Sequence, residues 1–174
     1  MGNYHLSAKV TLREAHISFL LTVVYGPTRR NRNVAFLREI RELKPQAGVQ
    51  WLILGDFNFV YKATDKNNNR LCPKLTTQIR DTLDGPSEIP LPNRKFTWSH
   101  QRSNPTMAKL DRFFCNEEWE STFSAHGLQA LSSSLSDHYP LFLSNQSGPR
   151  KPKSFKFENF WLKLPGFKDV VANA

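Results

Sequence analysis

The chain has 174 residues, of which 39% are hydrophobic and 12% aromatic, which suits one folded domain with a core and excludes a disordered chain. No apolar run is long enough to cross a bilayer, and no signal peptide is expected at the start. The 24 Lys and Arg against 15 Asp and Glu give a formal charge of +9, which favours a nucleic-acid partner unless the charge serves only solubility.

The cysteine count also restricts the class of protein. The chain has two, Cys72 and Cys115, which is too few for a disulfide framework or a metal cluster. We therefore expect a reducing compartment. Nothing in the sequence indicates a membrane partner, a small-molecule cofactor or a particular oligomeric state.

Two strands are predicted at the start. Residues 4–13 alternate weakly between polar and apolar side chains, as in an amphipathic strand. The apolar side comprises Leu6, Ala8, Val10 and Leu12. Residues 17–25 are rich in β-branched and aromatic residues, predicting a central strand that stops at Gly26-Pro27. Tyr25 at its end either binds a phosphate oxygen or covers the core with its hydroxyl in water.

A basic loop and a helix follow. Arg29, Arg30 and Arg32 suit phosphate contacts, although a solvated loop would have the same composition. Residues 33–44 have the apolar spacing of a helix, which Asn31 or Asn33 is expected to cap.

The stretch from Trp51 to Phe59 carries the main functional signal. Residues 51–54 predict a buried strand, which ends at Gly55. With Phe57 pointing into the core, Asp56 and Asn58 project to the same side. Together they can orient a water or hold a hard cation, although Gly, Asp and Asn are also ordinary turn residues. Strand, helix and strand in this order predict a layered α/β domain.

A second helix and a hairpin are expected next. Residues 75–83 predict a weak helix, and the stretch from Gly85 to Asn93 is expected to be irregular. Residues 95–99 and 109–114 predict two strands of one hairpin. Asp111 lies within the second of these, and a buried carboxylate is costly unless it is paired. Its neighbour Arg112 faces the other way, so the partner must come from another element.

The last predicted elements are short. They are a helix over residues 116–123 and strands over 128–131 and 141–143, with Asp137-His138 as an acid/base pair before the final strand. Residues 147–153 have the composition of a linker, and an aromatic, basic tail follows. The expected organisation is one domain over residues 1–146, followed by a linker and tail over 147–174.

The order of these motifs resembles that of the endonuclease/exonuclease/phosphatase family of metal-dependent phosphodiesterases. The matching stretches are Val24-Tyr25-Gly26-Pro27, Gly55-Asp56-Phe57-Asn58, Lys109-Leu110-Asp111-Arg112-Phe113-Phe114 and Ser136-Asp137-His138-Tyr139-Pro140-Leu141. Phe96-Thr97-Trp98-Ser99 and the tail segment 155–161 look like the subset encoded by plant LINE-type (non-LTR) retrotransposons.

This resemblance implies a four-layer α/β sandwich of two sheets flanked by helices. It also implies in-line hydrolysis of DNA phosphodiesters and an intracellular, nuclear location. Asp56 would orient and deprotonate the attacking water, and Asn58 would hold water or a phosphoryl oxygen. His138 would contact the phosphate or shuttle a proton, Asp111 would fix its ring, and Tyr25 would hydrogen-bond the phosphate.

The resemblance further implies a metal and a DNA surface. Because the available ligands are hard, the expected ion is Mg²⁺, with Mn²⁺ as the alternative. The metal-site candidates are Asp56, Asn58, Asp137 and His138. The DNA-binding candidates are Arg29, Arg30, Arg32, Lys95 and Trp98.

The sequence departs from the family pattern at two places. Thr28 stands where the family usually has an Asn. The family's early strands, one ending in Asn and one in the metal-ligand Glu, have no counterpart, since the first matching block begins at Val24. We therefore expect an N-terminally truncated copy. The alternative to a DNA endonuclease is an inactive remnant that at most binds nucleic acid.

Overall fold

A computed structural model describes residues 2–60, 62–68, 73–100, 103–145, 165–167 and 169. The predicted linker, most of the predicted tail and Cys72 lie outside these ranges, so the predicted boundary near residue 146 stays a prediction. Within the described ranges, none of the helices has the length and hydropathy needed to traverse a lipid bilayer.

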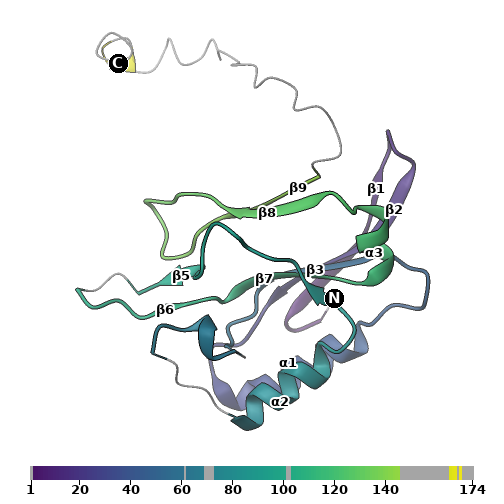
Figure 1. The fold of residues 1–174 in the computed structure, drawn as a ribbon, viewed down its shortest axis with the longest axis horizontal. Coiled ribbons are helices and arrows are strands. Elements are labelled where there is room, and N and C mark those ends of the chain that lie inside the picture. Colours follow the sequence, from purple (N-terminus) through teal and green to yellow (C-terminus); the bar gives the residue numbers. More distant parts are fainter. Residues whose placement is uncertain are drawn as a thin grey trace.

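A five-stranded mixed sheet forms the centre of the fold (Figure 1). Its strand order is β1-β2-β3-β7-β4. The strands are β1 (His5–Leu12), β2 (Ile17–Tyr25), β3 (Trp51–Asp56), β7 (Asp111–Cys115) and β4 (Ser87–Glu88). Only β2 and β3 run parallel among these pairs, while the other neighbours are antiparallel. The ends of β2 and β3 therefore reach the same edge of the sheet.

Helices α1 (Asn33–Glu42) and α2 (Pro73–Thr82) cover one face of this sheet (Figure 1). Phe36, Leu37 and Ile40 of α1 recur at helical spacing and are all buried, as predicted. They pack with Ile79 of α2 and with the apolar residues of β2 and β3 that face the helices. The parallel pair β2–β3 with α1 between them is the βαβ unit that the sequence predicted.

The opposite face of the sheet packs against a second, smaller sheet. This sheet is the antiparallel pair β8 (His126–Ala130) and β9 (Leu141–Asn145), and helix α3 (Glu117–Thr122) closes its end. A second hydrophobic cluster fills this layer, with Leu52, Phe113, Trp119 and Leu128 among its members. The predicted α/β class, with stacked sheets and helices outside, is confirmed.

The predicted hairpin between residues 95–99 and 109–114 is wrong in its pairing. Strand β5 (Trp98–Ser99) pairs with β6 (Met107–Ala108), whereas β7 pairs with β3 and β4. The chain changes sheets between β6 and β7, where the Lys109 N–H donates to the carbonyl of Asp65. Local residue patterns identified these two strands but not their neighbours, because such a pattern does not say which strand pairs with which.

Three smaller differences concern the ends and faces of elements. A 3₁₀ turn, η1 (Arg30–Arg32), leads directly into α1, so Arg32 is the N-cap and neither predicted asparagine caps the helix. Strand β4 lies in the stretch predicted to be irregular. The apolar side predicted for residues 4–13 is largely exposed, with Leu6 at 53% and Leu12 at 39%.

Candidate active site

The end of β3 forms a tight turn that places Asp56 and Asn58 side by side. The Asn58 backbone N–H donates to Oδ1 of Asp56 at 2.9 Å, and its Nδ2 donates to Oδ2 at 3.0 Å. Asn58 adopts a positive φ of 52°, which asparagine tolerates well. Phe57 between them is 1% exposed, as predicted. The turn interpretation and the site interpretation therefore describe one arrangement, because the turn aligns the two polar side chains.

Two glycines allow the neighbouring strand ends to approach closely. Gly55 has a φ of 138°, and a Cβ there would collide with the carbonyl of Val24. A Cβ on Gly26 would collide with the carbonyl of Phe57. The close approach pairs Tyr25 with Asp56 across β2 and β3. The sequence of each strand end thus brings the predicted phosphate-binding tyrosine beside the predicted base.

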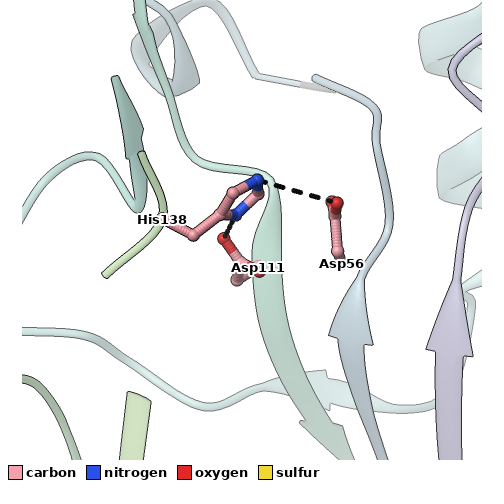
Figure 2. Close-up of side chains that lie close together, drawn as sticks. All are labelled: Asp56, Asp111 and His138. Atoms are coloured by element: carbon pink, nitrogen blue, oxygen red, sulfur yellow. Dashed lines mark hydrogen bonds and ion pairs between the residues drawn. The ribbon is translucent and has the colours of Figure 1, made fainter. Parts of the chain in front are cut away.

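Asp111 and His138 complete the cluster (Figure 2). Asp111 begins β7 directly opposite Asp56 at the end of β3. Its Oδ2 lies 2.8 Å from Nδ1 of His138, while Nε2 of the same ring lies 4.0 Å from Oδ2 of Asp56. The partner that a half-buried Asp111 requires is therefore His138, from the loop before β9. The imidazole lies between the two carboxylates and presents Nε2 toward Asp56.

The electrostatics of this cluster favour a bound cation. Burial, together with the charge of Asp111, raises the pKa of Asp56, against the opposing influence of Asn58 and His138. Among the described residues, no Lys or Arg forms an ion pair with either aspartate. Ligand atoms of Asp56, Asp111 and His138 lie within 4.8 Å of one another. Carboxylate oxygens at this spacing fit a hard divalent ion.

A cleft of about 620 Å³ opens over the cluster. Of the residues predicted from sequence, those that line it are Tyr25, Arg30, Asp56, Asn58, Trp98 and His138. Tyr25 is 66% exposed, so its hydroxyl is accessible to a ligand. Asp111 lies behind His138, in contact with its ring. Thr28, the departure from the family pattern, is also in the lining.

The remaining predicted residues lie outside the cleft lining, which does not include Arg29, Arg32 or Lys95. Asp137 is exposed and does not join the cluster of three possible ligands. Its Oδ2 accepts a hydrogen bond from Nε1 of Trp98 at 2.8 Å, and this bond chiefly lowers the pKa of Asp137. Asp137 therefore contacts strand β5 in this structure.

Sequence reasoning missed three residues at or near the site. Lys66 and His100 line the cleft, and both come from polar loops whose composition alone gave no reason to choose them. Thr97 is 0% exposed and hydrogen-bonds to the backbone of Asp111. A threonine between two aromatic residues in the predicted strand 95–99 was the available signal.

Comparison with known proteins identifies the fold. The endonuclease domain of TRAS1, a telomere-specific non-LTR retrotransposon, has a TM-score of 0.61 at 17% identity, over 83% of this chain and 64% of that one. The beta toxin 275-280 from Staphylococcus aureus has a TM-score of 0.60 at 12% identity, over 82% of this chain and 57% of that one. This chain therefore spans less than two-thirds of either protein.

Among curated proteins, none matches this sequence. The sequence profile described as Endonuclease/Exonuclease/phosphatase family matches residues 6–138. This match covers the cleft and every residue of the Asp56, Asp111 and His138 cluster. The chain belongs to the endonuclease/exonuclease/phosphatase family.

Proposed function

We propose that this chain hydrolyses phosphodiester bonds of DNA with the help of Mg²⁺, and that it derives from a retrotransposon endonuclease. The observation that carries the proposal is the cluster itself. An imidazole held by one aspartate faces a second aspartate of raised pKa, in a cleft lined by basic and aromatic side chains. Family membership supports the reaction class.

His138 acts on the phosphate in this proposal. Asp111 accepts the Nδ1–H of His138 at 2.8 Å, which sets the tautomer and leaves Nε2 directed into the cleft. A protonated Nε2 donates to a phosphoryl oxygen, and it can pass its proton to the leaving oxygen. Asp111 orients the ring.

Asp56 acts as the base that orients and deprotonates the attacking water. Two hydrogen bonds from Asn58 hold its carboxylate in place, and its raised pKa moves it toward the range in which a carboxylate is an effective base. Oδ2 of Asp56 and Nε2 of His138 are 4.0 Å apart. This separation leaves room for a substrate or water oxygen, placed off the line between the two atoms, to hydrogen-bond to both. Asn58 polarises the water or a phosphoryl oxygen.

The residues present fit a divalent ion: Asp56 and Asn58 would hold it through their oxygens, with Asp111 adjacent, and His138 would join them only with an unprotonated Nε2. Mg²⁺ is the ion we propose, with Mn²⁺ as a substitute, because hard oxygen ligands dominate the set. When bound, such an ion supplies Lewis-acid stabilisation of charge on the phosphate oxygens.

DNA binding rests on the charge of the protein and the lining of the cleft. The formal charge is +9, and Arg30 and Lys66 line the cleft beside the cluster. Trp98 offers a ring on which a base can stack, and the Tyr25 hydroxyl reaches a phosphate oxygen. A nuclear location rests only on the resemblance to retrotransposon endonucleases and is part of this proposal.

A second candidate is binding of nucleic acid without hydrolysis. One observation favours it: within the described residues, the possible ligand cluster holds two aspartates and a histidine. It does not include the glutamate that the family resemblance implies as the principal metal ligand. A weakly held ion would leave the basic cleft able to bind DNA but slow to cleave it.

Nicking of supercoiled plasmid by the purified chain tests the proposal, with Mg²⁺, with Mn²⁺ and with a chelator. His138→Ala and Asp56→Asn remove the proposed catalytic groups. His126→Ala is the matched control, because His126 is also half-buried and bonded through Nδ1, to the carbonyl of Phe123, outside the cleft. Circular dichroism and thermal unfolding establish that each variant is folded.

Metal-dependent nicking that is lost in His138→Ala and Asp56→Asn but kept in His126→Ala is the expected result. Folded wild-type protein that never nicks DNA contradicts hydrolysis and leaves the binding candidate. Binding is then measured by fluorescence anisotropy over a salt series, where contacts to several phosphates predict a steep fall in affinity with salt.

A further inference from the structure

The segment Thr97–Ser99 lies between the two elements that supply Asp111 and His138. One edge of this segment pairs with β6 through β5, and Figure 1 shows these two strands side by side. The other edge bonds to residues 137–139, with a bridge between Trp98 and His138. The segment therefore has backbone contacts with β6, which precedes β7, and with the loop that carries His138.

Thr97 makes the contacts on the Asp111 side. Its side-chain Oγ1 accepts hydrogen bonds from the backbone N–H groups of Leu110 and Asp111, both at 3.0 Å. Thr97 is 0% exposed, so water cannot replace this acceptor. These two N–H groups mark the point where the chain enters β7. The hydroxyl therefore sets the position from which the Asp111 side chain projects.

The same segment holds the loop that carries His138. The carbonyl of Thr97 accepts from the Tyr139 N–H at 2.8 Å, and the Ser99 N–H donates to the Asp137 carbonyl at 2.9 Å. Nε1 of Trp98 donates to Oδ2 of Asp137 at 2.8 Å. The residues before and after His138 are thus both hydrogen-bonded to Thr97–Ser99, which holds the backbone on either side of the imidazole.

We propose that Thr97 and Trp98 are positioning residues that hold Asp111 and His138 in hydrogen-bonding contact. The groups that do the positioning do not touch the reacting atoms. The Thr97 hydroxyl bonds to the β7 backbone, and the Trp98 indole N–H bonds to Asp137. The inference rests on the proposed function as far as catalysis is concerned. The geometric part, that the Asp111–His138 contact depends on Thr97, stands independently of activity.

Thr97→Val tests this with little change in side-chain volume, because it removes the acceptor of two buried N–H groups. Thr97→Ser restores the hydroxyl. Thr22→Val is the matched control: Thr22 is also 0% exposed and its Oγ1 bonds to Nε1 of Trp51 and to Ser7, on the helix-covered face of the sheet. All three variants are compared with wild type by thermal unfolding.

Two readouts separate positioning from general loss of stability. The first is the proton NMR resonance of the His138 Nδ1–H, assigned by its absence in His138→Ala. The second is plasmid nicking, resolved into kcat and KM. We expect Thr97→Val to lose the resonance and to lower kcat by about 100-fold with KM little changed, the size of effect that small misplacements of a catalytic group produce. Thr97→Ser and Thr22→Val are expected to retain both.

Retention of the resonance and of kcat in Thr97→Val overturns the proposal, as does an equal loss in Thr22→Val. If Thr97→Val does not fold, Trp98→Phe is the deciding variant, because phenylalanine keeps a ring for stacking but lacks the N–H that bonds to Asp137. An unchanged His138 resonance and an unchanged kcat in Trp98→Phe would then overturn the proposal. Wild type that shows the resonance but never nicks DNA refutes the proposed function, while loss of the resonance in Thr97→Val still supports positioning.

Discussion

The two faces of β7 take part in two clusters of charged side chains with contrasting surroundings. On one face, Asp111 lies behind His138, whose imidazole separates it from Asp56 in the cleft lining. On the other face, Arg112 is 1% exposed and binds Asp65 at 2.7 Å and Glu88 at 2.6 Å. Adjacent residues of one strand thus serve two clusters, because side chains alternate across a sheet.

The two groups of residues differ in how their negative charge is balanced. We call Asp56 and Asp111 the cleft carboxylates. We call the second group the arginine cluster, which consists of Lys62, Asp65, Glu88, Lys109 and Arg112. In the arginine cluster, permanent cations meet each carboxylate. Among the described residues, the only basic side chain that contacts the cleft carboxylates is the imidazole of His138. Unbalanced charge at an accessible site suits a cation and a reaction, whereas balanced charge suits architecture.

The largest effect is expected from removing a cleft carboxylate. Asp56→Asn should reduce metal-dependent nicking by about 1,000-fold, the contribution typical of a positioned general base. The amide cannot accept the water proton, although its size is unchanged. Initial rates on supercoiled plasmid measure the effect. Activity within tenfold of wild type would place the base at another residue.

Breaking the arginine cluster should affect folding instead. Arg112→Met leaves two carboxylates facing each other without their guanidinium, and loss of one partner of a buried ion pair costs about 3–5 kcal/mol. Chemical denaturation measures the free energy of unfolding. A loss below about 1 kcal/mol, the value typical of an exposed pair, would show that this cluster is not the structural counterpart of the cleft.

Mg²⁺ should distinguish the two clusters directly. Binding to the cleft carboxylates raises the unfolding free energy of the wild type by about 2.7 kcal/mol at a concentration 100 times Kd. Asp56→Asn should abolish this increase, whereas Lys62→Met, which changes only the arginine cluster, should keep it. Thermal unfolding with and without the ion is the measurement. An equal increase in all three proteins would assign the ion to another site.

The pH dependence of stability should carry the sign of a raised pKa. Folded Asp56 binds its proton more tightly than unfolded Asp56, so the wild type loses stability as the pH rises from the ordinary pKa of aspartate through the raised value. Asp56→Asn lacks this loss. Its stability relative to wild type should therefore increase over that interval in metal-free buffer. A relative stability that decreases would reverse the assignment.

The smallest effect is expected at the rim of the arginine cluster. The Lys62 side chain is 49% exposed and lies 3.0 Å from Glu88. Lys62→Met should lower the unfolding free energy by less than about 1 kcal/mol, because water screens an exposed ion pair. Comparison with Arg112→Met by denaturation gives the ratio of the two effects. Equal losses of unfolding free energy in Lys62→Met and Arg112→Met would mean that solvent exposure does not decide how much these ion pairs contribute to stability.

Much of the site was predictable because its signals are local. The strand ending at Asp56, the turn through Asn58 and the helix predicted over 33–44, which the structure ends at Glu42, follow from runs of neighbouring residues. The need of Asp111 for a distant partner also followed, since adjacent residues in a strand face opposite ways. That the partner is His138 came from family resemblance, and the 2.8 Å contact agrees with it.

Other features required the folded chain. The pairing of β5 with β6, the contact of Asp137 with Trp98 and the two bonds to Thr97 all join segments that no local pattern links. The partners of Arg112 come from residues 65 and 88, each far from it in sequence. Side-chain type indicated that these groups need partners, but it did not say which ones.

The sequence alone indicated most of the helices and strands, many of the residues that face the core, and the side chains that we propose carry the chemistry. These properties depend on periodicity, turn residues and residue type, all of which are local. The tertiary structure decided which strand lies beside which, and therefore which carboxylates are neutralised and which face the cleft. Charge balance depends on distances between segments remote in the chain, and only packing sets those distances.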